Sequence, residues 1–379
     1  MSEHKPVGGT LCTVPSIILL IVIFAALFCT AQRFIYGIGA VSNMNDGYPW
    51  GVWITYDVVV GTSFACGGYA MALLVYVFNK MEYHPLVRPA LLASLLGYSL
   101  AAASVFVDIG RYWNMGNVLL PWFMNNNSVL MEVAVCIALY TMVLLIEFAP
   151  VFLEKIKADK LRKRLDKVLF LFIALGILLP SMHQSSLGSV MIAAGQKLSP
   201  LWWTGLLPLL FLISALTMGY GVVVFESTLS STGFNRPLES GPLSKISAII
   251  PWLIVAYLVV RFLDLIVRGK LGLAFNGDLY GNMFILENLL LIIPMVMLFS
   301  KKCRNNPPLL FVGSVILMIA GGVYRFNTYI VGFNPGDGWQ YYPAVPEILI
   351  TFGIIAAEIW GYMWLVKRLP VLPAIHKHA

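Results

Sequence analysis

The side chains best able to do chemistry in this sequence are titratable groups inside long apolar segments. Glu132 and His183 stand out, because neither has an oppositely charged neighbour on its own segment and each borders small, polar residues. The sequence Asn125-Asn-Asn-Ser128 favours a helix N-cap before Glu132, and Pro180 loosens the helix just before His183. A histidine and a carboxylate at one pocket could hydrogen-bond the two carbonyl oxygens of a quinone ring and exchange its protons. We therefore predict a quinone-binding site that contains Glu132 and His183.

Two aspartates are expected at a similar depth. Asp57 on the second apolar segment and Asp108 on the third would supply charge and orientation near the quinone, because ionisable groups inside a membrane are costly and indicate a function by default. The alternative is structural ion pairing, for which Asp108 has Arg111 three residues away and Arg261 has Asp264 at the same spacing. For these two pairs the structural interpretation is favoured.

Polar residues on the third segment predict a proton path. Arg88 begins this segment at its cytoplasmic end, Tyr98 falls near the middle of the membrane, and Asp57 and Glu132 lie in the outer layer. Protons for quinone reduction would then come from the cytoplasm, and turnover would be electrogenic. In the alternative, Arg88 contacts lipid headgroups, Tyr98 only packs, and no net charge crosses the membrane.

Composition places these residues in a membrane. The 379 residues are 59% hydrophobic and 11% charged, against about 25% charged in an average soluble domain. About 20 apolar residues cross the hydrocarbon core as a helix, and ten segments meet this length. We predict an all-α polytopic membrane protein in which residues 1–379 form a single integral membrane domain. The spans are expected near 15–36, 51–79, 86–111, 126–150, 167–189, 202–228, 247–268, 280–300, 308–331 and 345–369.

The distribution of positive charge predicts the orientation. Lys and Arg gather at both termini and in alternate loops, most densely at 155–167, whereas the remaining loops hold only Arg111, Lys197, Arg268 and Lys270. This is the positive-inside pattern, so both termini are expected in the cytoplasm and the quinone site near the outer face of the membrane. The net charge of +7 is accordingly interpreted as contact with lipid headgroups, and no nucleic acid is expected as a partner.

Histidine and cysteine counts argue against metal cofactors. His183 is the only histidine inside a predicted span, which excludes a b-type haem held by two membrane histidines, although a His–Met pair stays open. The five cysteines form no C-x-x-C pair. We therefore expect no haem, no iron–sulfur cluster and no metal site in this chain.

The order of the spans is compatible with an internal repeat. Spans two to five and six to nine would form two parallel four-helix bundles with the first and last spans flanking them, since Glu132 and Glu287 fall at similar depths. Small residues in 61–70 permit close helix approach, and packing without a ligand is their favoured interpretation.

Several longer strings resemble a known family. They are Gly47-Tyr-Pro-Trp-Gly-Val-Trp53, Gly67-Gly-Tyr-Ala70, Tyr83-His-Pro-Leu-Val-Arg-Pro-Ala-Leu-Leu-Ala-Ser94, Asp108-Ile-Gly-Arg-Tyr-Trp-Asn114, Leu179-Pro-Ser-Met-His-Gln-Ser-Ser186 and Phe333-Asn-Pro-Gly336. Nearly end to end, the chain resembles the membrane subunit of hydrogenase-2-type periplasmic nickel–iron hydrogenases, within the NrfD-like, or polysulfide reductase membrane-subunit, family.

The resemblance implies partners and a substrate. A nickel–iron large subunit, an iron–sulfur small subunit and a ferredoxin-like iron–sulfur subunit would dock on the outer face and pass electrons to menaquinone or ubiquinone held by this chain. The chain would thus belong to a hydrogen:quinone oxidoreductase complex without containing the hydrogenase active site. Two other classes stay open: a secondary transporter or ion channel, and a structural anchor without a redox site.

Overall fold

The computed structural model describes residues 4–374, and within them ten helices are long and apolar enough to cross a membrane. The prediction of an all-α polytopic membrane protein is confirmed. The predicted cytoplasmic termini include residues 1–3 and 375–379, which lie outside the described part. The membrane-crossing elements, in chain order, are α1 (Val14–Tyr36), η2 to η3 (Trp53–Val77), η4 with α4 (Met81–Asp108), α5 (Val129–Lys155), α7 (Leu169–Ala193), α8 (Leu207–Gly233), α9 with α10 (Ser240–Val267), α11 (Leu279–Phe299), α13 with η9 (Pro307–Val331) and α14 (Val345–Arg368).

Local sequence explains where several helices begin. The Ser128 hydroxyl accepts a hydrogen bond from the Met131 amide at 3.4 Å, and the Asp278 carboxylate accepts one from the Gly281 amide at 2.7 Å. The Asn306 side chain does the same for the Leu309 amide at 3.3 Å. Each cap satisfies an amide that lacks a partner within its helix. The cap predicted before Glu132 is therefore present, at Ser128.

The second span is central and irregular. It runs through a π-helix, η2 (Trp53–Val60), two short α-helices, α2 (Gly61–Phe64) and α3 (Gly67–Ala72), and a second π-helix, η3 (Leu73–Val77). In its most apolar stretch 78% of the residues are buried, against 17% in α1, which places this span inside the bundle and α1 at its edge.

Small residues allow the central span to approach its neighbours. The Gly68 amide donates to the Ser94 hydroxyl of α4 at 2.8 Å. A Cβ atom on Gly219 of α8 would lie 2.7 Å from the Cys66 carbonyl oxygen, closer than any real Cβ contact. These glycines therefore serve close packing between helices.

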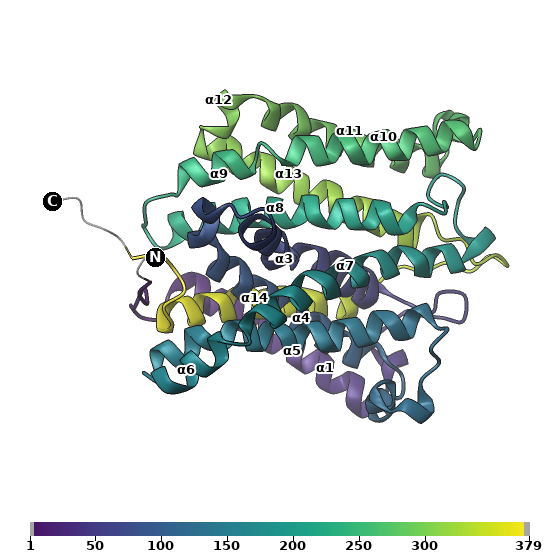
Figure 1. Ribbon diagram of the computed structural model, residues 1–379. Helices are drawn as coiled ribbons and strands as arrows, with labels where there is room; N and C mark the ends of the chain where they lie inside the picture. Colours follow the sequence, from purple (N-terminus) through teal and green to yellow (C-terminus); the bar gives the residue numbers. More distant parts are fainter. Residues whose placement is uncertain (1–3, 375–379) are drawn as a thin grey trace.

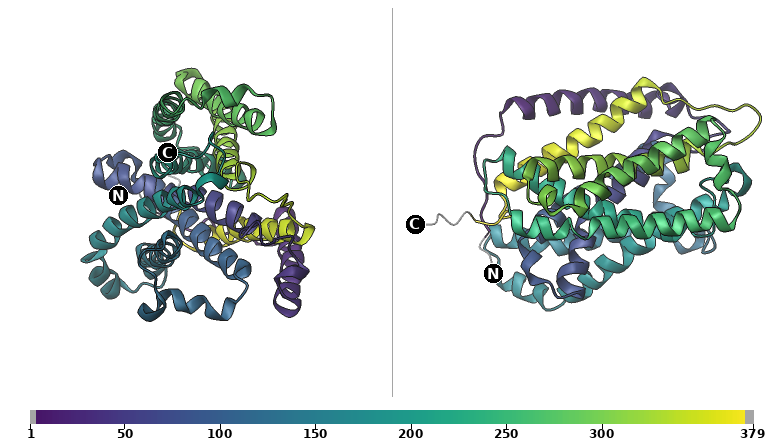
Figure 2. Two further views of the ribbon diagram at one scale, coloured as in Figure 1. Left: turned by 90° about the vertical axis from the view of Figure 1, so that its right-hand side faces the viewer. Right: turned by 90° about the horizontal axis from the view of Figure 1, so that it is seen from above.

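Packing contacts sort the remaining spans into groups. The second span, α4, α5 and α7 pack on one another, as do α8, α10, α11 and α13, while α1 and α14 pair along the side. The end-on view in Figure 2 shows the green helices gathered apart from the blue and teal ones, with purple α1 beside yellow α14. That the two groups are repeats of each other stays a prediction.

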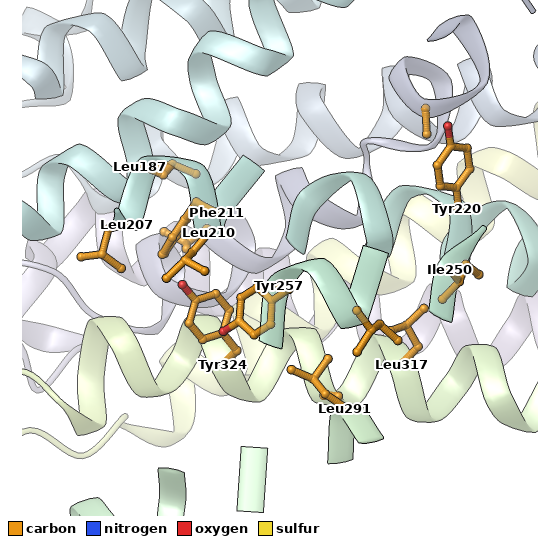
Figure 3. Close-up of a cluster of buried hydrophobic side chains, with 14 of the residues drawn as sticks. Leu187, Leu207, Leu210, Phe211, Tyr220, Ile250, Tyr257, Leu291, Leu317 and Tyr324 are labelled. Carbon is orange, nitrogen blue, oxygen red and sulfur yellow. The ribbon is translucent and has the colours of Figure 1, made fainter. Parts of the chain in front are cut away.

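Apolar side chains and tyrosines from both groups meet in the main core. Figure 3 shows part of it, where Leu187 of α7, Phe211 of α8, Tyr257 of α10 and Tyr324 of α13 lie together. The rings of Tyr257 and Tyr324 are 5.2 Å apart, edge to face.

The two ends of the bundle differ. His4 and Pro373 form an isolated bridge at the end that also holds α6 (Asp159–Asp166), α9 (Ser240–Ile246) and α12 (Lys301–Arg304) (Figure 1). We call this the terminal end, and the other the opposite end. At the opposite end the Tyr341 hydroxyl donates to Glu347 Oε1 at 2.7 Å and accepts from the Val52 amide at 2.8 Å. Burial raises the pKa of Tyr341, so its phenol stays protonated and holds two loops together.

Candidate functional site

His183 lies fully buried on α7, in a network centred on Thr62 of the second span. The Thr62 hydroxyl oxygen is 3.2 Å from His183 Nε2 and 3.1 Å from Gln184 Nε2. It also donates its own hydrogen to the Val58 carbonyl oxygen, at 2.6 Å. All three side chains of this network have no exposed surface. Pro180 does not break α7, which runs from Leu169 to Ala193, so His183 and Gln184 stay within this helix.

This network fixes the protonation pattern of His183. A hydroxyl has one hydrogen and two lone pairs. Because the Thr62 hydrogen is used by Val58, both contacts from α7 must be donated to Thr62, and the imidazole proton is therefore on Nε2. His183 Nδ1 and Gln184 Oε1 are left as buried acceptors that make no hydrogen bond of normal geometry among the described residues, with the Val133 backbone near His183 and the Tyr98 hydroxyl near Gln184. We call these two atoms the acceptor pair. They suit a ligand that offers hydroxyl hydrogens.

Glu132 of α5 contacts α7 about one helical turn from His183. Its Oε1 accepts a hydrogen bond from the Ser186 hydroxyl at 2.6 Å, and Ser186 follows His183 by three residues on α7. Glu132 is half-buried near the start of α5, so its carboxylate can exchange protons with water more readily than a fully enclosed group. The structure thus brings together α5 and α7 at the two residues predicted for the quinone.

Asp57 and Asp108 belong to a different region. Asp57 Oδ2 accepts from the Thr351 hydroxyl of α14 at 3.2 Å, and Asp57 Oδ1 is buried without a partner among the described residues. Asp108, at the end of α4, is near Arg33 of α1, whose guanidinium donates to the Val107 and Ile109 carbonyls at 2.6 and 2.5 Å. No direct contact to Glu132 or His183 is recorded for either aspartate. Their predicted role beside the quinone stays untested.

The prediction that Arg261 pairs with Asp264 is wrong. Arg261 instead pairs with Glu287 of α11 at 2.7 Å, and Asp264 pairs with Arg268 at 2.6 Å. Arg261 points into the bundle, where Glu287 also accepts hydrogen bonds from Asn327 at 2.7 Å and Trp202 at 3.0 Å.

The prediction that Asp108 pairs with Arg111 is also wrong, because no such ion pair occurs among the described residues. Arg111 follows the end of α4 and is exposed, so the three-residue spacing does not bring it over Asp108 as it would within a helix. Arg33 of α1 takes the position near Asp108 instead.

Two residues of the predicted proton path, Arg88 and Tyr98, lie on α4, and both contact α5. Arg88 binds Glu154 of α5 at 3.0 Å and the Pro370 carbonyl at 2.9 Å, both at the terminal end. The Tyr98 ring packs edge to face against Tyr140 at 4.5 Å and lies 5.7 Å from the His183 ring. The Tyr98 hydroxyl is buried with no partner among the described residues.

Sequence reasoning missed Thr62 and Gln184 as site residues. Thr62 lies 121 positions before His183, so only the packing of the second span against α7 reveals their contact. A weak signal existed, since Gln184 adjoins His183 and Thr62 interrupts an apolar stretch. The sequence places the cation Arg325 inside the ninth span, and the structure shows that it donates to the Val59 carbonyl at 2.8 Å and the Phe211 carbonyl at 3.0 Å.

The comparisons with known proteins bear on this architecture. The family model described as "Polysulphide reductase, NrfD" matches residues 40–334, which include Thr62, Glu132 and His183. The chain belongs to the NrfD family. The family expected from the sequence strings is thereby confirmed.

Two curated relatives of this NrfD-family chain are named as membrane or redox-complex subunits. It is 45% identical, over 99% of its own length and 97% of the relative's, to the "Probable Ni/Fe-hydrogenase 2 b-type cytochrome subunit" of Escherichia coli (strain K12). It is 26% identical, over 89% and 86% of the two chains, to the "Menaquinone reductase, integral membrane subunit" of Nitratidesulfovibrio vulgaris. These relatives group the chain with the membrane subunits of oxidoreductase complexes.

One expectation needs correction. The Escherichia coli relative is named a b-type cytochrome subunit, which contradicts the expectation that this chain holds no haem. The histidine count does not support an expectation that broad. Haem iron can be held by one histidine, alone or with methionine, so a single membrane histidine excludes only a bis-histidine site.

Proposed function

We propose that this NrfD-family chain is the quinone-reactive membrane subunit of a respiratory nickel–iron hydrogenase complex. Hydrogen is oxidised outside the membrane to two protons and two electrons, and the electrons pass through iron–sulfur subunits to menaquinone or ubiquinone held here. The main support is the 45% identity, over 99% of the chain, to the Escherichia coli subunit named for nickel–iron hydrogenase 2. The partners would be a nickel–iron large subunit, an iron–sulfur small subunit and a ferredoxin-like iron–sulfur subunit.

In this proposal the quinone ring lies between α5 and α7, near Glu132 and His183. Reduction of a quinone takes two electrons and two protons and yields two hydroxyl groups. The acceptor pair would receive hydrogen bonds from these hydroxyls, and Glu132 would exchange protons with the ring. Asp57 and Asp108 would contribute negative charge from the neighbouring α4–α14 region.

The membrane placement is part of the proposal. The terminal end would face the cytoplasm and the opposite end the periplasm of a bacterial inner membrane. Support comes from the basic helix α6 at the terminal end, which contains Lys160, Arg162, Lys163 and Arg164. Proton uptake from the cytoplasm, with Arg88, Tyr98, Asp57 and Glu132 on the path, would make turnover electrogenic.

A b-type haem, where this chain holds one, would supply one-electron transfer between the docked clusters and the quinone. Within the described spans, His183 is the fully buried imidazole, and its Nδ1 has no protein partner. It is the side chain that would ligate such a haem, and a haem bound there would take the place of the quinone at His183 Nδ1.

The test is purification of the complex through a tag on this chain. We expect nickel and iron to copurify and hydrogen to reduce a soluble quinone analogue. A preparation without these metals, in which the lone subunit takes up a solute into vesicles, would instead establish the transporter alternative. Unchanged quinone reduction after replacement of both Glu132 and His183 would establish the structural anchor.

A further inference from the structure

A polar stripe on α14 has no part in the site described above. Thr351, Glu358 and Tyr362 are spaced by seven and then four residues, which puts their side chains on one face of the helix. This face points inward, since Thr351 binds Asp57 of the second span and Tyr362 binds Glu226 of α8. Polar residues on the inward face of a membrane helix indicate a function, because apolar residues would pack there at a lower cost in free energy.

The stripe begins beside a cavity with room for water. At the terminal end a cavity of about 70 Å³ is lined by Glu226, Ser230, Arg236 and Glu239 among others. One water molecule needs about 10–15 Å³ of such volume, so the cavity has room for several. The Tyr362 hydroxyl donates a hydrogen bond to Glu226 Oε1 and so joins this cavity to α14.

Glu358 lies one turn deeper, near the middle of α14. Its Oε1 is 3.3 Å from the position that a Cβ atom on Gly97 would take, so the carboxylate lies against the bare backbone of α4. No ion-pair partner is recorded for it within residues 4–374. A carboxyl group in such surroundings is most stable in its protonated form and can release a proton to a neighbour.

The stripe ends at Asp57. This aspartate is 5% exposed, one of its oxygens has no partner among the described residues, and it lies within electrostatic range of Glu358. Thr351 and Glu358 are about 10 Å apart along the helix axis, which requires water to relay the proton between them. Tyr56 is in electrostatic range of both carboxylates.

We propose that Glu226, Tyr362, Glu358 and Asp57 form a proton-transfer path from the terminal end towards the quinone. Protonated Glu358 passes its proton through water to the Asp57 carboxylate, the Tyr362 hydroxyl then gives its proton to Glu358 while accepting one from Glu226, and Glu226 takes up a proton from the cavity. Once Asp57 releases its proton towards the quinone, every residue has its starting protonation state again, and two passages deliver the two protons that accompany two electrons to the quinone. This path rests on the proposed function for its acceptor, but it enters through α8 and α14 rather than through Arg88 and Tyr98.

The first test uses the complex in oriented liposomes, with hydrogen, a quinone analogue and a pH dye on the terminal-end side. We expect Glu358→Gln and Tyr362→Phe to lower proton uptake from that side at least tenfold. Glu147→Gln is the matched control, because Glu147 is also a membrane carboxylate but lies against Gly176 of α7. Uptake that survives Glu358→Gln, or that is lost only in Tyr98→Phe, overturns the path.

The second test needs no turnover. In infrared spectra of the purified complex, the protonated-carboxyl band that is missing in Glu358→Gln should shift within seconds of transfer to D₂O. Tyr362→Phe should slow this exchange at least tenfold, and Tyr98→Phe should not. Absence of the band, or exchange indifferent to Tyr362, overturns the path. Wild-type protein that shows this exchange but reduces no quinone would refute the proposed function and leave the path standing.

Discussion

Ser186 donates a hydrogen bond to Glu132 across the interface of α5 and α7, with 2.6 Å between Oγ and Oε1. Ser186 also lies 2.8 Å from the Met182 carbonyl oxygen, and its single hydrogen cannot serve both acceptors fully. The contact therefore suits a carboxyl group that alternates between charged and neutral forms. When Glu132 is protonated, the Ser186 hydrogen can turn to Met182 and the carboxyl hydrogen becomes available to a ligand.

Replacing Glu132 by Gln should lower hydrogen-dependent quinone reduction by about 10²-fold, since a positioned acid–base group contributes about 10²–10⁴-fold. Hydrogen oxidation with an artificial dye at the outer face should persist, because it does not use this chain. The two rates are measured on one purified preparation. Loss of both would mean failed assembly, and Glu147→Gln, at a membrane carboxylate away from the acceptor pair, serves as the control.

Replacing Thr62 by Val should change quinone binding rather than the electron supply. The substitution keeps the shape but leaves the Nε2 hydrogens of His183 and Gln184 without their acceptor, at a cost of about 1–3 kcal/mol for each unsatisfied group. We expect a several-fold higher KM for the quinone. Thr217→Val is the control, because the Thr217 hydroxyl bonds only to the Ile213 carbonyl of its own helix. Equal KM values in both variants would speak against the acceptor pair as the quinone site.

Reporter fusions should reveal the orientation. A fusion after Lys163, in α6, and one after Asp337, in the loop before α14, lie at different ends of the bundle and should give opposite cytoplasmic and periplasmic signals. Fusions at these positions that report the same compartment would refute the proposed topology.

The ion pair of Arg261 and Glu287 should matter for stability more than for catalysis. Both side chains are almost fully buried, with 2% and 1% exposure, and removal of one partner from a buried pair costs about 3–5 kcal/mol. Glu287→Ala should therefore lower the Tm of the detergent-solubilised complex, while quinone KM stays unchanged in whatever assembles. The double variant Arg261→Met, Glu287→Leu should recover part of the loss, because no unpaired charge remains. A Tm equal to that of the wild type in Glu287→Ala would contradict this role.

The sequence predicts the membrane spans better than it predicts which side chains contact one another. Apolar length alone is sufficient for the membrane spans, and the Ser128 cap depends only on residues close in the chain. The partner of Arg261 could not be predicted, because spacing along the helix points to Asp264. Only the packing of α10 against α11 brings the Glu287 carboxylate to the Arg261 guanidinium. The sequence also could not show that Asp57 and Asp108 lie in a different region from Glu132 and His183. Depth in the membrane does not indicate the direction in which a side chain leaves its helix.

The π-helix η2 determines which neighbours the central span meets. Each residue of an α-helix turns the chain by about 100°, and a wider turn carries an extra residue within the same stretch. The wider turns of η2 therefore change the angle between Asp57, which faces α14, and Thr62, which lies five positions later and faces α7. Deleting one residue between Trp53 and Val60 would restore a regular helix and rotate everything after it away from His183. The π-helix η2 thus sets the angle between the side of the span that contacts the α14 stripe and the side that contacts the quinone region.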